Sequence, residues 1–380
     1  MTLYSIFTKI NMKKIILFSN DDAHFYNHLL PIALEVKRQG YKIKILTNVI
    51  NHQQKIEENG LTVIPVEIRR GNLNPFIELI LLFKVIRIVS QEKPDILHNF
   101  TIKPIIYGTI AGFFCKTSKV INNFLGMGYL FINNSFVPKY IRIFLAKILA
   151  FIGKYKSIIF IVQNKDDRKL LIDLNIAKED KVINQCSVGI DSEQSDLLPE
   201  KKGAIIFALV ARMLVDKGIN EFIDAAKLLH KKGIEAEFWL VGSPDKSNAA
   251  SVDEEILEEY HKQGFIKYLG YQSDIRKIWQ DAHVAVLPSY REGLSRSLLE
   301  AGAHGRAVIT TDAPGGRELI QDKINGLLVP LKDSQALATA IENLVNDVEF
   351  RKKLATTLRS DVLKNYDSRL IAQKIVSFYL

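Results

Sequence analysis

Short apolar runs recur along the first half of the chain, and stretches with helical character lie between them. Such alternation is typical of a parallel sheet covered by helices on both faces. The runs that we predict as strands are KIILFS (14–19), KIKILT (42–47), LTVIPVE (61–67), PDILHN (94–99), KVINNF (119–124) and SIIFIVQ (157–163).

A polar stretch at 191–203 interrupts the series, and the same alternation then begins again. The stretch is predicted as a linker, and the fold class as α/β with two Rossmann-like, doubly wound parallel sheets facing a cleft. We place the domains at 12–195 and 196–365, with a C-terminal helix at 366–380 packing back on the first. The second set of predicted strands is AIIFALVAR (204–212), EAEFWLVG (235–242), FIKYLG (265–270), HVAVLPS (283–289), RAVITT (306–311) and NGLLVP (325–330).

Composition narrows the class of protein. A chain of 380 residues with 47% hydrophobic and 24% charged residues suits two globular domains. No apolar run is long enough for a spanning helix, and the start of the chain has no signal-peptide pattern, with Met12 reading as the more natural start. Two distant cysteines indicate neither a disulfide framework nor a metal site, and they favour the cytoplasm. The net charge of +9 fits anionic partners, although scattered surface lysines explain it equally well.

Polar residues that could bind a ligand or take part in catalysis follow the predicted strands of the second half. Arg212 ends one strand and Lys217 lies shortly before the next helix, a pattern that suits a diphosphate. Two solvated charges at a turn explain it equally well. Gly242 permits close backbone approach, and Tyr271 stands in a loop that could flank a flat base. Taken alone, Gly242 is better explained by a simple turn, and Tyr271 by a structural loop.

The stretch YREGLSRSLLEAGAHG (290–305) carries the strongest signal. Glu292 lies just before a predicted helix, and Glu300 lies inside it. Their spacing is on the order of 10 Å, too wide for two carboxylates acting across one glycosidic bond. We interpret the two glutamates as accepting hydrogen bonds from two separate sets of hydroxyls. The backbone amides of Gly293, Leu294 and Ser295 would hold a phosphate between them. A nucleotide-sugar has this layout.

As an ordered set, RMLVDKG, EGLSRSLLEAGAHGRAVI, TDAPGGRELI and NGLLVP resemble the retaining glycosyltransferases of family 4, which have the GT-B fold. The resemblance covers most of 204–333. It implies transfer of a sugar, often N-acetylgalactosamine, from a UDP-sugar to an undecaprenyl-diphosphate-linked saccharide during surface-polysaccharide assembly. It also implies a peripheral enzyme on the inner face of the plasma membrane that uses no cofactor and no metal.

The resemblance assigns roles to individual residues. Arg212 and Lys217 would bind the diphosphate, Glu292 the transferred sugar, and Glu300 the ribose. Ser295 stands where many relatives have Pro, and Ser is a good residue near a helix start. The first loop, SNDDAHFYNHLLP (19–31), lacks the glycines that many relatives have there.

The first half offers candidate acceptor residues. After the strand PDIL, His98 would orient the acceptor or the sugar, and Lys103 would meet an acceptor phosphate; a structural His and a solvated Lys are equally good explanations. Asn20 and His24, at the end of the first strand, are further acceptor candidates. The segment 136–160 mixes basic and apolar residues and is predicted to contact an anionic membrane surface, whereas a core helix with snorkelling lysines is the alternative.

Two rival functions remain compatible with the pattern: a UDP-sugar epimerase on a similar fold, and a non-catalytic nucleotide-sugar-binding protein. An NAD oxidoreductase is disfavoured because neither first strand is followed by G-x-G-x-x-G. Nucleic acid is disfavoured as a partner because no basic motif is interleaved with aromatic residues.

Overall fold

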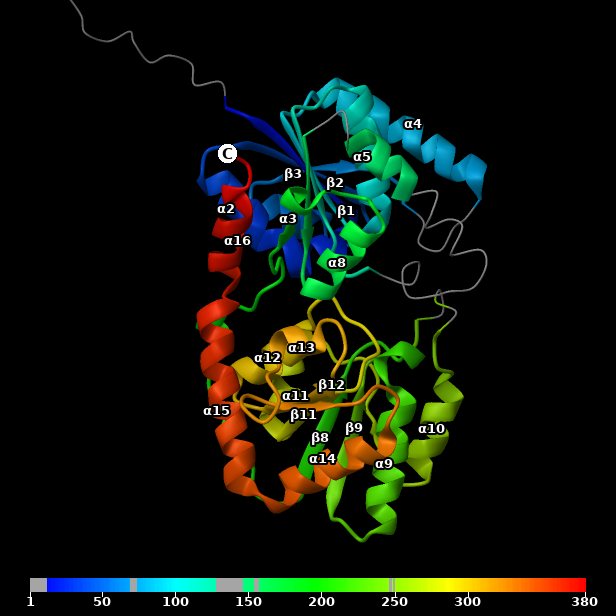
Figure 1. Ribbon diagram of the computed structural model, residues 1–380, viewed down its shortest axis with the longest axis vertical. Helices are drawn as coiled ribbons and strands as arrows, with labels where there is room; N and C mark the ends of the chain where they lie inside the picture. The colour runs from blue at the N-terminus through cyan, green and yellow to red at the C-terminus, as the bar shows by residue number, and fades with distance from the viewer. Residues whose placement is uncertain (1–11, 69–73, 128–145, 154–156, 246–247, 249) are drawn as a thin grey trace, which may run out of the picture. The chain divides into compact units, whose positions relative to one another are not determined.

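The computed structural model describes residues 12–68, 74–127, 146–153, 157–245, 248 and 250–380. Contacts within the chain divide it into two compact units, whose elements are labelled in Figure 1. The first unit comprises the residues up to Val162 together with 168–187 and 372–380, and the second comprises 163–167 and 188–371. The last residues of the chain therefore belong to the first unit, although they follow the second in sequence.

A parallel sheet forms the centre of the first unit. Its described part has seven strands in the order β3-β2-β1-β4-β5-β6-β7, winding outward in two directions from β1. This is the doubly wound arrangement that the apolar runs predict. The strands are β1 Lys14–Asp21, β2 Lys42–Asn48, β3 Thr62–Pro65, β4 Ile96–Phe100, β5 Lys119–Asn123, β6 Ile158–Val162 and β7 Val182–Asn184.

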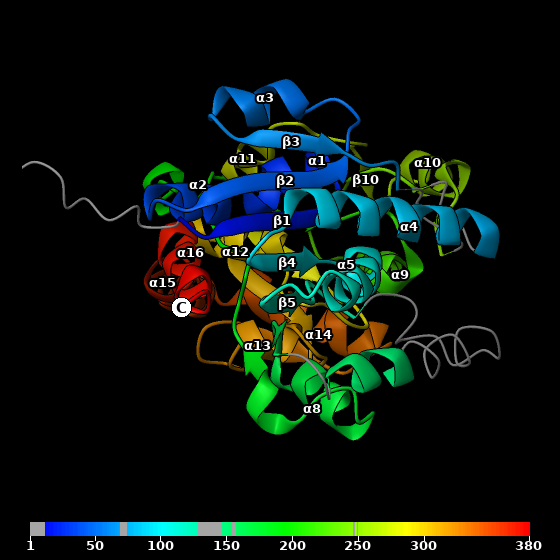
Figure 2. The same ribbon diagram turned by 90° about the horizontal axis from the view of Figure 1, so that it is seen from above.

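Helices cover both faces of this sheet, as the continuous burial of its strands requires. Leu81 and Val85 of α4 pack with Tyr107 of α5 over Ile16 and Leu97 of the sheet. Figure 2 shows α4 and α5 on one side of the sheet and α2 and α16 on the other. The helices of this unit are α1 Asp22–His24, a π-helix Phe25–Leu29, α2 Leu30–Arg38, α3 Gln53–Glu58, α4 Pro75–Glu92, α5 Ile102–Phe114, a helix over 146–153, and α8 Lys165–Asp173, which begins in the second unit.

The second unit repeats the architecture. Its sheet has six described strands in the order β10-β9-β8-β11-β12-β13, all paired in parallel. The strands are β8 Ile205–Val210, β9 Ala236–Val241, β10 Lys267–Tyr268, β11 Val284–Leu287, β12 Ala307–Thr311 and β13 Leu327–Val329. The helices are α9 Ile219–Lys231, α10 Glu254–Lys262, α11 Ile275–Asp281, α12 Arg296–Ala303, α13 Gly316–Leu319, α14 Ser334–Asn346, α15 Val348–Asn365 and α16 Ser368–Ser377, whose end joins the first unit.

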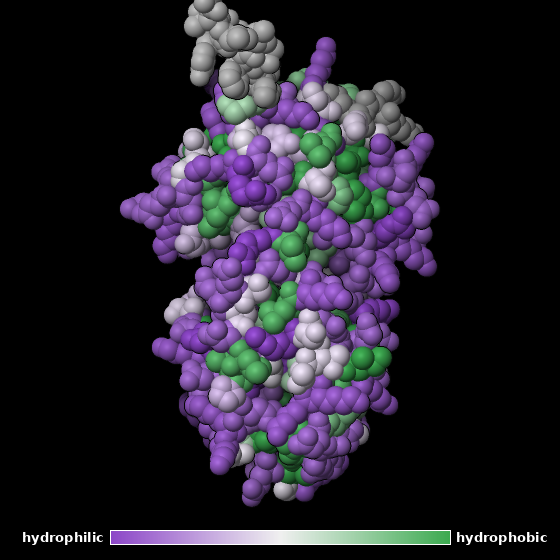
Figure 3. All heavy atoms as spheres, turned by 90° about the vertical axis from the view of Figure 1, so that its left-hand side faces the viewer, coloured by the Kyte–Doolittle hydropathy of each residue, from purple (hydrophilic) through white to green (hydrophobic). Residues whose placement is uncertain are grey.

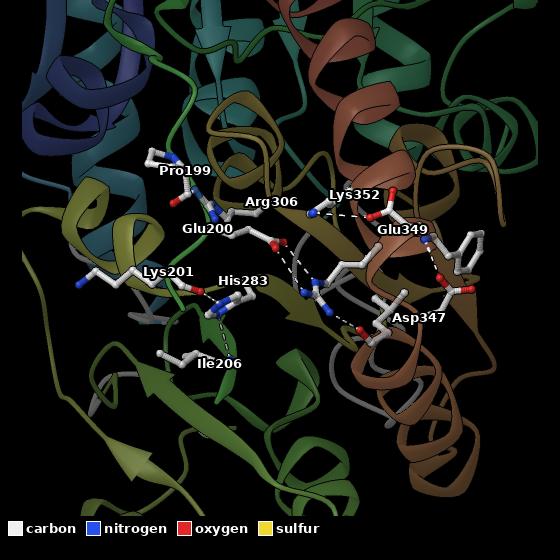
Figure 4. Close-up of polar contacts among 12 residues, drawn as sticks. Pro199, Glu200, Lys201, Ile206, His283, Arg306, Asp347, Glu349 and Lys352 are labelled. Carbon is white, nitrogen blue, oxygen red and sulfur yellow. Dashed lines mark hydrogen bonds and ion pairs between the residues drawn. The ribbon is translucent and has the colours of Figure 1, made fainter. Parts of the chain in front are cut away.

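The segment predicted as a linker is anchored to the second unit rather than free (Figure 4). Glu200 accepts two hydrogen bonds from the guanidinium of Arg351, at 3.1 and 3.2 Å. Arg306 donates to the backbone oxygen of Leu198, and His283 Nε2 lies 2.9 Å from the backbone oxygen of Lys201. Arg306, His283 and Arg351 are almost completely buried. The boundary between the units consequently falls at residues 187 and 188, before the polar stretch.

Most of the surface that Figure 3 shows is hydrophilic, and hydrophobic residues lie on it in separate groups. No helix in the described part of the chain is both long enough and apolar enough to cross a bilayer.

Candidate functional site

Four loops of the second unit lie along the carboxyl edge of its sheet. Arg212 follows β8, Gly242 follows β9, Tyr271 follows β10 and Glu292 follows β11. Because β10, β9, β8 and β11 are neighbours and run in parallel, these loops share one edge, which is where doubly wound sheets bind ligands. The structure therefore brings these predicted site residues to one edge.

An ion pair joins two of the predicted residues. Lys217 Nζ lies 2.6 Å from Glu292 Oε1, and both side chains are about 15% exposed. The backbone supports this pair, because the carbonyl of Asp216 accepts hydrogen bonds from Ser289 Oγ at 3.0 Å and from the Tyr290 amide at 2.8 Å. The turn that carries Lys217 is thereby held against the loop that carries Glu292. A cation and an acid therefore lie side by side, and both side chains are partly exposed.

Helix α12 begins at Arg296, slightly later than predicted, and Ser295 is its N-cap, accepting a hydrogen bond from the Leu298 amide. The expectation that Ser suits this position is confirmed. The amides of Gly293 and Leu294 precede the helix rather than forming its first turn. Together with the Ser295 amide, they donate to no described residue, which leaves three backbone donors without a hydrogen bond in the described chain.

The other predicted residues of this edge are more exposed. Arg212 forms an ion pair with Asp245 at 2.7 Å, with its side chain 56% exposed. Glu300 pairs with Arg296 on the same helix at 2.8 Å. Tyr271 is 75% exposed. To bind a ligand, Arg212 and Glu300 would have to exchange or share these surface partners. Breaking such exposed ion pairs costs little free energy.

Gly242 makes a close backbone approach, and its partner is another loop of the second unit. Its φ is +138°, and a Cβ built on it would lie 1.8 Å from the backbone oxygen of Ala211. Gly218, with φ +75°, similarly approaches the backbone oxygen of Pro288, at 2.2 Å from a built Cβ. Only glycine fits such contacts, which close the ends of β8, β9 and β11 together.

A group of buried residues behind the Glu292 loop escaped the sequence analysis. Asn164 Nδ2 lies 3.2 Å from the backbone oxygen of Glu292 and 3.1 Å from that of Gly293. Asp167, which is fully buried, receives hydrogen bonds from Asn164 and from the Arg291 guanidinium. Burial raises the pKa of the Asp167 carboxyl, and Arg291 opposes that shift. The only signal in the sequence was the polar run QNKDD directly after a strand.

The structure corrects the expectation that His98 faces the acceptor. Its side chain is fully buried, and Nδ1 lies 2.6 Å from the hydroxyl of Tyr379. Leu97 packs under α4 and α5, so the next residue of the strand points to the opposite face, which the C-terminal residues cover. Burial lowers the pKa of His98 to about 3, so the ring is neutral. Of the two interpretations of His98, the structural one is the one that fits.

The remaining acceptor candidates lie at the carboxyl edge of the first sheet. Lys103 pairs with Glu78 of α4 at 2.8 Å. Asn20 lies near the end of β1 with a buried Oδ1 that has no hydrogen-bond partner among the described residues, and His24 Nδ1 is 3.4 Å from Ser19 Oγ. Thr101, directly after β4, has φ +72° and ψ 164°, a region that costs a β-branched residue about 1–3 kcal/mol. Such strain gathers at functional sites, and β4 is the neighbour of β1.

Two further predictions concern metal binding and membrane contact. Within the described residues, no group of three or more His, Cys, Asp or Glu side chains is arranged to hold a metal ion. The predicted membrane segment 136–160 lies mostly outside the described residues; of it, 146–153 is helical and 157–160 belongs largely to β6.

Comparisons with known proteins agree with this architecture. The family model for "Glycosyl transferases group 1" matches residues 204–347, and that for "Glycosyl transferase 4-like" matches residues 14–157. Anabaena HepE, solved in complex with UDP, superposes with a TM-score of 0.77 over 97% of this chain and 99% of that one, at 17% identity. The superposition establishes the fold, which is GT-B.

Some curated relatives align with 90% or more of this chain. One is the N,N'-diacetylbacillosaminyl-diphospho-undecaprenol alpha-1,3-N-acetylgalactosaminyltransferase of Campylobacter jejuni, 29% identical over 95% of this chain and 96% of the relative. Another is the capsular polysaccharide biosynthesis glycosyltransferase CapM of Staphylococcus aureus, 27% identical over 90% and 88%. Each domain matches its own glycosyltransferase model, and the relatives extend over both domains. The chain therefore belongs to the GT-B glycosyltransferases, with a group 1 second domain and a 4-like first domain.

Proposed function

We propose that this protein is a retaining glycosyltransferase that moves a sugar, N-acetylgalactosamine in the favoured case, from a UDP-sugar to a saccharide linked to undecaprenyl diphosphate. The observation that carries the proposal is the Lys217–Glu292 pair beside three backbone amides that donate to no described residue, at the carboxyl edge of the second sheet. The names of the Campylobacter relative and of the HepE complex supply the acceptor and donor classes.

In this proposal Lys217 and Arg212 bind the donor diphosphate, and the amides of Gly293 to Ser295 bind its distal phosphate. Glu292 accepts hydrogen bonds from hydroxyls of the transferred sugar, and Glu300 from those of the ribose. The ion pair keeps Lys217 in place before the donor arrives, so little reorganisation is needed when negative charge grows on the leaving phosphate. Such preorganised charge stabilisation is the main source of catalysis that the site offers.

The step itself breaks the bond between the sugar C1 and the β-phosphate oxygen, and the electron pair leaves with UDP. The acceptor hydroxyl attacks C1 from the same face, and its proton passes to the departing phosphate oxygen. The anomeric configuration is thereby retained without a covalent enzyme intermediate. We also propose that transfer requires no metal and no cofactor, and that the lipid acceptor brings the enzyme to the cytoplasmic membrane surface.

The test incubates the protein with a panel of UDP-sugars, with and without a short-chain lipid-diphosphate saccharide, in the presence of EDTA. UDP release that depends on the acceptor, together with a product of retained configuration by NMR, supports the proposal. Acceptor-free isomerisation of the UDP-sugar would instead identify an epimerase. A protein that binds UDP-sugars without turning any over would be a binding module, and inhibition by EDTA would refute metal independence.

A further inference from the structure

We propose that the outer face of α4 inserts into the surface of an anionic lipid bilayer. This face, called here the α4 apolar face, consists of Phe76, Leu79, Ile80 and Phe83. It is distinct from the segment 136–160 in which the sequence suggested membrane contact. The inference rests on the proposed function, because a lipid-linked acceptor gives the enzyme a reason to bind a membrane.

The α4 apolar face is unusual for a helix on a globular unit. Phe76, Ile80 and Phe83 are 76%, 68% and 63% exposed, and Leu79 is 49% exposed. Their spacing of three and four residues puts them on one side of the helix. The core side is formed by other residues, Leu81, Val85 and Val89, which are at most 7% exposed. The helix is therefore apolar on two sides, and the described residues of the first unit cover only one of them.

Basic residues continue this face. Lys84 and Arg87 are exposed and form no ion pair with a described acid, and Arg87 extends the line of Phe76, Ile80 and Phe83 by one turn. The acids of the helix are neutralised, Glu78 by Lys103 and Glu92 by Lys44. An apolar stripe followed by unpaired cations complements an anionic interface, where each cation contributes about 1 kcal/mol.

The α4 apolar face lies near the carboxyl edge of the first sheet. Glu78 accepts hydrogen bonds from Lys103 and from the Tyr107 hydroxyl, so the first turns of α4 are fixed beside the start of α5. Helix α5 follows β4 directly, at the carboxyl edge of the sheet. A shallow groove of about 190 Å³ runs along the same part of α4, lined by Glu67, Ile77, Glu78, Ile80, Leu81 and Lys84. A bilayer contact here would present a lipid-linked acceptor at the edge where Asn20, His24 and Lys103 lie.

The size of the surface favours a bilayer over a second protein. Four partly exposed side chains offer on the order of 500 Å² of apolar area, a size typical of functional patches. A stable protein interface needs about 800 Å² from each partner. An interfacial helix needs much less, because its apolar side chains only have to reach the boundary between headgroups and acyl chains.

The test measures co-sedimentation of the full chain with vesicles that contain phosphatidylglycerol and with vesicles of phosphatidylcholine alone. The triple variant Phe76→Ser, Ile80→Ser, Phe83→Ser should reduce partitioning to the anionic vesicles by roughly tenfold or more. The single variant Phe76→Ser, at the most exposed position of the α4 apolar face, should give a smaller loss and covers the case in which the triple variant folds poorly. A matched control variant removes three exposed isoleucines elsewhere: Ile50→Ser, Ile256→Ser, Ile324→Ser.

Several results would overturn the inference. Wild-type protein that binds neither kind of vesicle would be one such result. Another would be variants of the α4 apolar face that partition like wild type, and a third would be a control variant that loses as much vesicle binding as those variants do. If wild type is a dimer in sedimentation velocity and the triple variant is a monomer with unchanged vesicle binding, the α4 apolar face binds a second copy of the chain instead. Turnover of a short-chain acceptor in vesicle-free buffer separates the two proposals. Its absence in wild type refutes the enzymatic proposal alone, and its preservation in the triple variant shows that the site is intact.

Discussion

The buried contact between His98 and Tyr379 makes a prediction that separates a structural histidine from a catalytic one. The perturbation is a change of pH, compared between wild type and His98→Asn. Asn can still hydrogen-bond to the Tyr379 hydroxyl, but it cannot titrate. Tyr379→Phe is the matched control, because it removes the hydrogen bond and keeps the imidazole.

The magnitude follows from the two protonation equilibria. Burial lowers the pKa of His98 to about 3 in the folded protein, whereas the unfolded chain has the ordinary value of 6.5. Between these pH values the unfolded state binds more protons than the native state, so stability decreases as the pH falls through 6.5. From pH 7 to pH 5, the contribution of His98 amounts to a loss of about 2 kcal/mol, a factor of roughly 25 in the unfolding equilibrium of the first unit.

The assay is native-state hydrogen exchange by mass spectrometry, followed on peptides that contain β4 and corrected for the intrinsic pH dependence of exchange. These peptides report the opening of the first unit, so buried histidines of the second unit, such as His283, do not interfere. We expect wild type and Tyr379→Phe to lose protection between pH 7 and pH 5, and His98→Asn to lose about 2 kcal/mol less.

Equal pH dependence in wild type and His98→Asn would refute the buried, neutral state of His98. Transfer activity supplies the complementary measurement. At pH 7.5, where both proteins are folded, His98→Asn should keep kcat within about tenfold of wild type, since the ring has no exposed atom to offer a substrate. A loss of several orders of magnitude would mean that His98 becomes accessible and takes part in the reaction.

Three further predictions concern the second unit. Lys217→Ala removes the ammonium 2.6 Å from Glu292 and should lower kcat/KM at least about 100-fold by UDP release, whereas Lys227→Ala should not; equal rates would refute its role. Asn164→Ala frees the buried backbone oxygens of residues 292 and 293 and should lower kcat/KM about tenfold; unchanged kinetics would make the contact purely structural. Gly242→Ala places a Cβ 1.8 Å from a backbone oxygen and should cost at least about 2 kcal/mol in thermal unfolding, and an unchanged Tm would contradict the geometry.

The amino-acid sequence by itself determined the strands and the edge at which the site lies. Buried parallel strands need continuous apolar runs, and the polar residues that follow those runs necessarily meet at the carboxyl edge. Arg212, Gly242, Tyr271 and Glu292 could be assigned to one edge for this reason. Local rules also sufficed for Ser295, because N-capping depends only on residues within one helical turn.

Tertiary structure decided which residues face one another. Glu292 pairs with Lys217, 75 positions earlier, and His98 is covered by Tyr379, 281 positions later. Neither partner can be read from local periodicity, which shows that a side chain alternates between faces but not what covers each face. The same limit hid Asn164 behind the Glu292 loop and the anchoring of the predicted linker by buried arginines. The sequence likewise does not show which face of α4 is covered, because its apolar residues occupy both faces and only packing distinguishes them.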